Sequence, residues 1–357
     1  MLKYSVRVLT AMLLFSVAVF CGDTPKNIIF MVGDGMGVHY VSASVLTMED
    51  DQFTRFTTSG LSVTCSADAL ITDSAAGATA FAIAKRTNNG MISMLPDKTI
   101  LKTVLELAEE KGYLTGVIST SSITHATPAC FYAHVESRKM EYEIAEFLVD
   151  SGVEVAIGGG TKFFLPEGKG GERNDAKNIV ATMKEKGYEY FDNVKELKEY
   201  SGDKKILSLL ASNGLEKAHD RDYTLGELSS KAINRLSNGE NGFFLMIEGS
   251  QIDWAGHAND QEYAMGELED FNTALKAVLD FAEKDGNTLV IVTADHETGG
   301  MSIVEGNLDG SGMEMAFGTG HHTPVLVPIF SYGPGSEKMT GIKQNTDIGE
   351  YLRSFYK

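Results

Sequence analysis

The stretch NIIFMV, residues 27–32, is apolar at every position after Asn27, and it indicates the fold of the whole chain. A strand with no polar alternation has both faces buried, which is typical of a mostly parallel sheet covered by helices on each side. Runs of the same kind recur along the chain, at residues 113–120, 153–157, 243–247, 288–293 and 325–332.

Segments with helical periodicity separate these runs, for example at residues 99–112 and 262–286. Strands that alternate with helices predict a doubly wound α/β fold with helices on both faces of the sheet. Residues 164–223 are richer in Lys and Glu, and we expect them to form a small insertion over one edge of the sheet. No repeat or linker composition interrupts residues 23–357, which predicts a single domain.

The first 22 residues have the pattern of a secretory signal peptide. A basic start is followed by an apolar stretch from Val8 to Phe20 that is short for a membrane span, and polar residues come next. The pattern predicts export, to the periplasm or the extracellular medium. Cys21 directly follows the apolar stretch and is a candidate lipid-attachment site, so a lipoprotein and a freely soluble exported protein both fit. A lipid anchor is the only membrane attachment that we expect.

The remaining composition excludes some partners. A net charge of -18 with a pI near 4.9 argues against a nucleic-acid-binding surface, which needs basic residues. It would also repel a phosphate-bearing substrate unless the site itself is locally positive. Cys65 and Cys130 do not make a disulfide framework, and we expect both to be small buried side chains. The Gly/Asp-rich residues 305–315 favour an exposed turn over a calcium loop.

Acids and histidines follow several of the predicted strands. In an open α/β sheet, ligands bind beyond the carboxyl ends of the strands. Each residue alone could be a helix cap or a surface pair, but together they place four carboxylates and up to four imidazoles at one rim. They are Asp34 in GDGMG, Glu248, Asp253 and His257 in EGSQIDWAGH, Asp295 and His296 in ADHETGG, and His321 and His322 in GTGHH.

So many clustered acids would raise one another's pKa and cost stability unless cations compensate them. Nitrogen and oxygen ligands without thiolates suit zinc in open catalytic sites, and positions with oxygen ligands suit magnesium. The sequence therefore predicts a divalent metal centre at the rim.

The segment TDSAAGATA, residues 72–80, adds a hydroxyl to this centre. By itself it reads as a capped, Ala-rich helix. Beside metal ions, however, Ser74 becomes a candidate nucleophile, and the free N–H groups of the helix start can bind an anion. Arg138, in HVESRKM, is a candidate for a bidentate phosphate contact, although it could equally be a solvated surface arginine.

The motifs VGDGMG, TDSAAGATA, HATPACFYAHVESR, EGSQIDWAGHA, TADHETGG and GHHTP…YGPGS occur in an order that resembles the bacterial alkaline phosphatases, from about Lys26 to the C-terminus. The resemblance implies that Ser74 becomes phosphoserine and that Arg138, positioned by Asp73, binds the phosphoryl oxygens. His322 is preferred to His321 because it stands ten residues before Tyr332, as the family's ligand does. The implied metal ligands are Asp34, Asp295, His296 and Ser74 for one zinc, Asp253, His257 and His322 for the other, and Asp34, Thr127 and Glu248 for magnesium.

Two positions depart from the enteric form of that family. His125 stands where that form has Asp, and Trp254 stands where it has Lys, a pair that resembles other members including cold-adapted bacterial ones. His125 leaves the identity of the third metal open, since imidazole favours zinc over magnesium. Both residues are expected near the substrate, and the missing lysine predicts weaker binding of inorganic phosphate.

The resemblance thus implies a secreted, metal-dependent phosphomonoesterase of broad specificity, acting on phosphate monoesters and commonly found as a homodimer in its family. A phosphodiesterase of the same superfamily is the alternative, whereas a sulfatase would need a C-x-P-x-R motif that the sequence lacks. A non-catalytic exported protein that binds phosphate or metal is a further alternative, which would leave Ser74 unexplained.

Overall fold

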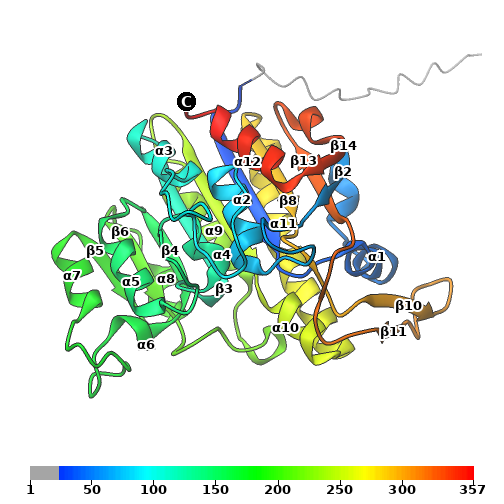
Figure 1. Cartoon of the computed structure of the whole chain (residues 1–357), viewed down its shortest axis with the longest axis horizontal. Coiled ribbons are helices and arrows are strands. Elements are labelled where there is room, and N and C mark those ends of the chain that lie inside the picture. Colours follow the sequence, from blue (N-terminus) through cyan, green and yellow to red (C-terminus); the bar gives the residue numbers. More distant parts are fainter. Residues whose placement is uncertain (1–23) are drawn as a thin grey trace, which may run out of the picture.

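The computed structural model describes residues 24–357, and a ten-stranded sheet runs through this part of the chain (Figure 1). Its strands are β1 (Asn27–Gly33), β2 (Thr58–Val63), β3 (Leu114–Ser122), β4 (Val155–Gly159), β5 (Tyr188–Phe191), β6 (Lys205–Leu209), β7 (Phe243–Gly249), β8 (Thr288–Thr293), β13 (Val327–Tyr332) and β14 (Gly341–Gln344).

The strands are ordered β14-β2-β13-β8-β1-β7-β3-β4-β6-β5. All neighbours pair in parallel except β13, which runs antiparallel to both β8 and β2. Every residue of β1, β7 and β8 is buried, as their apolar sequences predict. The six predicted strands are confirmed, with ends that differ from the prediction by at most two residues.

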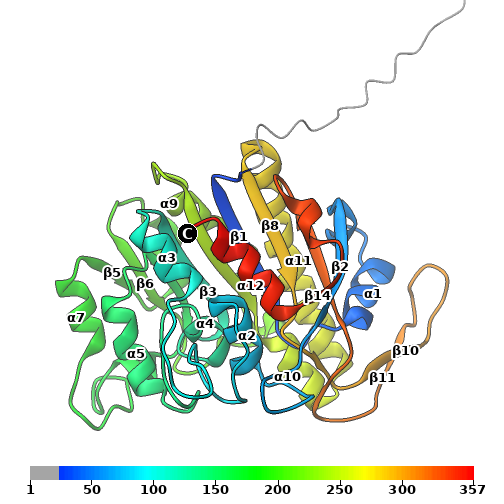
Figure 2. The same cartoon turned by 45° about the horizontal axis from the view of Figure 1, so that its top comes forward.

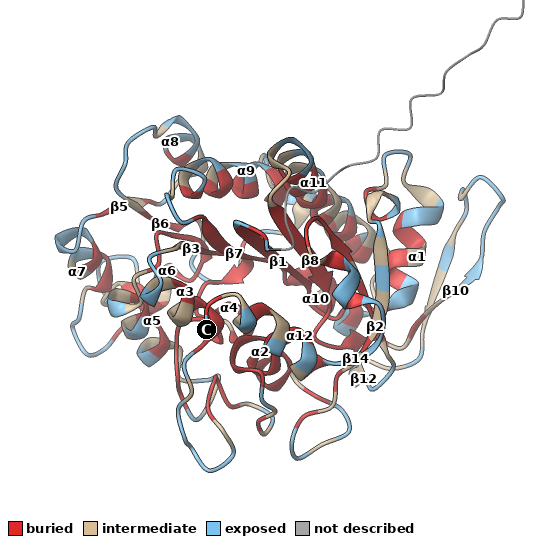
Figure 3. Ribbon diagram, turned by 90° about the horizontal axis from the view of Figure 1, so that it is seen from above, coloured by how far each residue is buried: buried red, intermediate tan, exposed pale blue. Residues whose placement is uncertain are grey.

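Helices cover both faces of the sheet, so the predicted doubly wound α/β fold is confirmed (Figure 3). On one face lie α2 (Ser74–Ile83), α3 (Val104–Glu110), α4 (Ala126–Ala129), α5 (Glu141–Asp150), α6 (Thr161–Phe164), α7 (Ile179–Glu185) and α12 (Asn345–Ser354). On the other lie α1 (Val38–Thr47), α8 (Val194–Glu199), α9 (Leu225–Leu236), α10 (Gln251–Ala258) and α11 (Gln261–Asp285).

Capping residues set the ends of the predicted helices. The helix expected at 99–112 begins only at Val104, because Thr103 and Glu106 form a capping box there. The long helix expected at 262–286 is α11, whose last turn ends at Gly286 with a φ of 71°. A glycine in this left-handed conformation is a common helix terminator.

The segment 164–223 forms one edge of the sheet instead of lying over it, which differs from our expectation. β6 pairs in parallel with β4, in the register Val155↔Ile206, and β5 pairs in parallel with β6. The strand KILSL is buried from Ile206 onward, but it is short and lies among charged residues. Its apolar character is therefore lost when the composition is averaged over the segment.

Several other expectations concern surface features. Residues 305–315 form the exposed turn that was predicted, between β10 (Met301–Glu305) and β11 (Glu314–Phe317), at the end of the molecule beyond α1 (Figure 2). Cys130 is buried as expected, while Cys65 is half-buried, and neither forms a disulfide within residues 24–357.

Residues 1–22, with the predicted signal peptide and Cys21, lie outside the described residues. In the described part of the chain, no helix combines the length and the apolarity needed to cross a membrane. Export, the single domain and the homodimer stay predictions.

Candidate active site

The predicted acids come together because four neighbouring strands in the middle of the sheet deliver them. The strands β8, β1, β7 and β3 lie side by side, and their carboxyl ends reach one rim. Asp34 follows β1, Glu248 belongs to β7, and Asp295 follows β8 by one residue. His125 and Thr127 follow β3, at the start of α4.

His322 reaches the same rim because β13 runs opposite to its neighbours, so the residues before β13 lie at the carboxyl ends of the other strands. A two-residue strand, β12 (His322–Thr323), pairs with β9 (Glu297–Thr298) and fixes this approach. The rings of His322 and His296 stack with centroids 3.5 Å apart. His321, its neighbour in sequence, is exposed.

Three groups of potential metal ligands lie at this rim among the described residues. In each, the ligand atoms of three side chains lie within 4.8 Å of one another, and Asp34 belongs to two of the groups. We call them the outer group (Asp253, His257 and His322), the inner group (Asp34, Asp295 and His296) and the third group (Asp34, His125 and Glu248).

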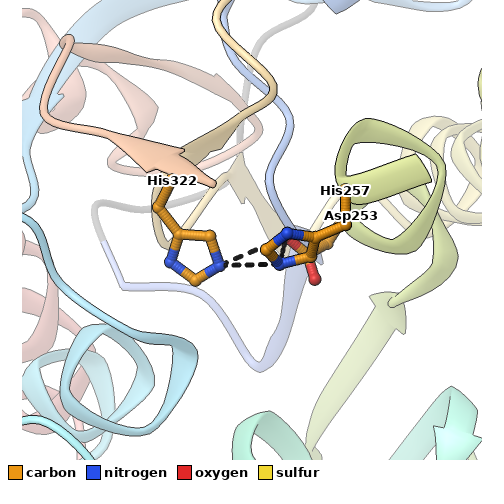
Figure 4. A group of neighbouring side chains, drawn as sticks. All are labelled: Asp253, His257 and His322. Atoms are coloured by element: carbon orange, nitrogen blue, oxygen red, sulfur yellow. Dashed lines mark hydrogen bonds and ion pairs between the residues drawn. The ribbon is translucent and has the colours of Figure 1, made fainter. Parts of the chain in front are cut away.

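In the outer group, α10 carries Asp253 and His257 one turn apart, and they face His322 of β12 (Figure 4). The two Nε2 atoms are 3.1 Å apart, and they lie 3.4 and 3.5 Å from Oδ1 of Asp253. Ligands of a tetrahedral zinc ion stand about 3.3 Å apart, given metal–nitrogen distances of about 2.0 Å.

The protonation of these two rings also fits a cation. Nδ1 of His257 lies 2.8 Å from the carbonyl oxygen of Gly320, and Nδ1 of His322 lies 2.8 Å from that of Thr72. Because a carbonyl only accepts, each Nδ1 carries the hydrogen. The two Nε2 atoms then face each other, and a proton or a metal ion between them relieves the repulsion of their lone pairs.

The inner group has similar spacing. Nε2 of His296 lies 3.4 Å from Oδ1 of Asp34 and 3.3 Å from Oδ2 of Asp295. The other oxygen of Asp295 accepts from the backbone N–H groups of Gly35 and His296, which orients the carboxylate. Oγ of Ser74 lies 3.3 Å from Nε2 of His296, so the hydroxyl is at the edge of this group.

The third group and Thr127 contain buried polar atoms without hydrogen-bond partners in the described residues. They are Nδ1 of His125, Oγ1 of Thr127, Oε1 of Glu248 and both carboxylate oxygens of Asp34. The other oxygen of Glu248 accepts from Ser119, which also contacts Ser121 and Ser250. Buried polar atoms are costly when unpaired, so this set of donors fits a bound cation.

Three of the four crowded carboxyl groups are hard to ionise without a cation, while the burial of Asp253 is outweighed by the histidines around it, which lower its pKa. Burial, and then the charges of Asp295, Asp253 and Glu248, raise the pKa of Asp34 well above its usual range. Burial raises the pKa of Glu248 to about 7, and burial together with the charge of Asp253 raises the pKa of Asp295 to about 6. A divalent cation favours the ionised forms, which is the compensation that the sequence analysis invoked.

These shifts predict how the ion-free chain responds to pH. A carboxyl group whose pKa is raised on folding stabilises the fold below its unfolded-state pKa, and this stability is lost as the pH rises through the folded value. For Glu248 that window runs from an ordinary 4.5 to about 7. Burial lowers the pKa of His125 to about 3 and that of His296 well below its usual value. These two histidines make the stability rise with pH up to about 6.5, so below that pH they oppose the loss caused by the carboxyl groups.

Above about pH 6.5, free histidine has lost its proton, so the opposing histidine contribution ends. The carboxyl contribution continues, and His322 acts in the same direction, because its burial is outweighed by its contact with Asp253, which raises its pKa. We therefore expect the melting temperature of the chelated chain to fall as the pH rises from about 6.5 through the folded pKa of Glu248, about 7. Since ions hold the carboxylates ionised throughout, the metal-loaded chain should change less, and differential scanning calorimetry in both states checks this. Parallel changes in the two states would contradict the assignment of these acids to ion sites.

The helix that begins at Ser74 lies unusually close to the inner group. All ten residues of α2 are buried, and a Cβ placed on Gly77 would lie 3.0 Å from Cβ of Asp295. The small side chains of SAAGATA thus let the helix start approach the rim, which explains this bare stretch of sequence. Asp73 caps the helix by accepting from the N–H groups of Ala76 and Gly90.

Arg138 is not a free surface residue. Its Nη1 lies 3.1 Å from Oδ2 of Asp73, and its Nη2 lies 3.1 Å from Nε2 of His125. The ring of His125 in turn meets Trp254 edge-on, with centroids 6.1 Å apart. Guanidinium N–H groups and a helix start therefore flank Ser74, an arrangement that suits an anion with several oxygens.

Comparison with known proteins agrees with this geometry. The sequence profile described as "Alkaline phosphatase" matches residues 25–313, most of the chain. The chain belongs to the alkaline phosphatase family. Alkaline phosphatase 3 of Bacillus subtilis is 43% identical over an alignment of 300 residues, and the match covers 79% of this chain and 63% of that protein. The chain thus spans less than two thirds of this relative's length.

The solved alkaline phosphatase of the Antarctic bacterium TAB5 superposes with a TM-score of 0.87 and 38% identity, over 93% of this chain and 98% of that one. A variant of that alkaline phosphatase, in which aspartate replaces a histidine, is described with magnesium in its M3 site. It superposes with a TM-score of 0.86 and 37% identity, over 94% of this chain and 98% of that one.

Within this alkaline phosphatase fold, sequence reasoning missed the residues that support the ligands. Ser119 donates to Glu248 and itself contacts Ser250, and Thr298 donates to Asp253 while lying 3.2 Å from Nδ1 of His296. Serine and threonine are common in strands and turns, so no single serine or threonine in the sequence indicates a role beside a metal ligand. The run STSS at the end of β3 was the only hint.

Proposed function

We propose that the chain is a metal-dependent phosphomonoesterase that acts through a phosphoserine at Ser74. The position of the Ser74 hydroxyl supports the proposal most directly. It lies at the start of α2, 3.3 Å from Nε2 of His296 in the inner group, and the helix cap Asp73 contacts Arg138. The hydroxyl therefore lies between a candidate metal group and an anion site, which is the arrangement that phosphoryl transfer requires.

The donors fit two zinc ions and a magnesium ion. The inner and outer groups would each hold zinc, and the third group with Thr127 would hold magnesium or, because His125 offers a nitrogen, zinc. When bound, such ions lower the pKa of a hydroxyl and neutralise developing oxyanions. The His125–Trp254 pair supports placing the chain among the His/Trp-type bacterial members of the family.

The chain's own groups then have distinct roles. Arg138 and the N–H groups of the α2 start bind the phosphoryl oxygens, and Asp73 orients Arg138. Oγ of Ser74 attacks phosphorus as the ester oxygen leaves opposite to it and takes up a proton, which releases the alcohol. Water then cleaves the phosphoserine and returns Ser74 and inorganic phosphate. Two in-line displacements retain the configuration at phosphorus.

Every contact proposed here is made to the phosphoryl group, so the alcohol should matter little and the specificity should be broad. Comparing the rates of several phosphate monoesters with that of a diester, before and after chelation, tests the proposal. We expect similar monoester rates, a much slower diester, and loss of activity on chelation that zinc and magnesium restore. A faster diester would favour a phosphodiesterase, and phosphate binding without turnover would favour a binding protein.

Trp254 stands where the enteric form has lysine, which leads to a prediction about product inhibition. We expect Trp254→Lys to have an inhibition constant for phosphate about tenfold lower than that of Trp254→Gln, because an ammonium group near the phosphate adds a charged hydrogen bond. Trp254→Gln removes the ring without adding charge and serves as the control. Equal inhibition constants in the lysine and glutamine variants would count against this role.

A further inference from the structure

Gly214, at the end of the segment 164–223, lies directly against the ring of Trp254. A Cβ placed on Gly214 would lie 2.5 Å from Cη2 and 2.9 Å from Cζ3 of that ring. Both distances are shorter than non-bonded carbon atoms tolerate. Only glycine therefore allows the backbone to approach the ring this closely.

The loop that carries Gly214, residues 211–215, is anchored on both sides. At one end, the carbonyl of Ala211 accepts from the N–H groups of Gly160 and Thr161. At the other, the N–H of Leu215 donates to Thr120 at 2.9 Å, and the side chain of Gln251 donates to the carbonyl of Leu215 at 2.8 Å. Because the loop is held in this way and the indole is only half-buried, added bulk at Gly214 should displace the ring.

From Trp254, contacts continue to the proposed phosphate site. The indole meets the ring of His125 edge-on, and Nε2 of His125 lies 3.1 Å from Nη2 of Arg138. Arg138 contacts Asp73, the cap of the helix that begins with Ser74. A displaced indole would thus remove the side support of His125 and, through it, of the guanidinium.

We propose that loop 211–215 is a positioning element for the phosphate site, with Gly214 as the residue that seats Trp254. The inference rests on the proposed function and deepens it, since it gives the C-terminal end of the segment 164–223 a role in phosphate affinity. Gly214 contacts no reacting atom and acts through Trp254, His125 and Arg138.

The test uses the metal-loaded protein, in which Trp254 is the single tryptophan of the chain and thus the source of indole fluorescence. In Gly214→Ala we expect a shifted emission maximum and a phosphate inhibition constant raised by at least about tenfold, as for a slightly misplaced binding group. Ser212→Ala, an exposed change in the same loop, should alter neither. Unchanged emission and phosphate inhibition in Gly214→Ala would overturn the proposal.

A double-mutant cycle shows whether the effect passes through the indole. Trp254→Phe shortens the ring, so adding Gly214→Ala to it should change the phosphate inhibition constant by less than about twofold. If Gly214→Ala alone does not fold, the double variant should restore the melting temperature. An equal loss in both backgrounds, or no such restoration, would refute seating of the ring.

Failure of the proposed function would look different. If the wild-type chain neither hydrolyses monoesters nor binds phosphate, the proposed function is wrong. The emission shift and the melting temperature of the double variant would still decide whether Gly214 positions Trp254.

Discussion

Ser74→Ala is expected to lower the turnover of phosphate monoesters by at least about a thousandfold and to abolish the phosphoenzyme. No other hydroxyl is needed to explain the geometry, since Oγ of Ser74 alone links the α2 start to His296. The substitution removes one atom from a residue at a helix start whose cap, Asp73, remains. The fold should therefore stay unchanged, as should the ion content of the outer and third groups, to which Ser74 does not belong.

Turnover with labelled monoester, acid-quenched phosphoenzyme, calorimetry and metal analysis together measure this outcome. Ser354→Ala, an exposed serine at the end of α12, is the control and should behave as the wild type. Retention of a labelled phosphoenzyme in the Ser74 variant would place the nucleophile elsewhere.

His322→Ala is expected to lower zinc affinity in the outer group by at least about 100-fold and to reduce activity strongly. The structure offers a matched control in the neighbouring residue. His322 is half-buried and its Nε2 lies 3.1 Å from that of His257, whereas the side chain of His321 is exposed and belongs to none of the ligand groups among residues 24–357.

His321→Ala should therefore keep both zinc and activity, and competition with a zinc indicator gives the two affinities. Equal losses in both variants would mean that the substitutions act on the loop instead of on a ligand. Loss in His321→Ala alone would reverse the assignment.

Much of the fold and of the candidate site could be predicted from the sequence, because the central strands carry two signals at once. In β1, β7 and β8 the apolar run shows burial, and the acid at its end shows where the chain reaches the rim. Once the strands are parallel, Asp34, Glu248 and Asp295 must meet at one edge. The meeting of these three acids could therefore be predicted without knowing the conformation of the loops.

The rest depends on contacts that single positions do not reveal. Strand β6, which lies between β4 and the edge strand β5, was hidden by charged neighbours in the sequence. The reversal of β13, which brings His322 to the rim, follows from pairing across the sheet. Ser119, Thr298 and Gly214 act only through the side chains that they contact. Those side chains belong to distant segments, so their roles can be recognised only in the folded structure.

The sharing of Asp34 by the inner and third groups would tie the two proposed ions to one carboxylate. Filling either group changes the charge and orientation that this carboxylate offers to the other, so the two occupancies share a coupling free energy. By thermodynamic reciprocity, each ion must alter the affinity of its neighbour by the same factor. Uptake should accordingly be cooperative, whether positively or negatively, and cannot be described by two independent dissociation constants.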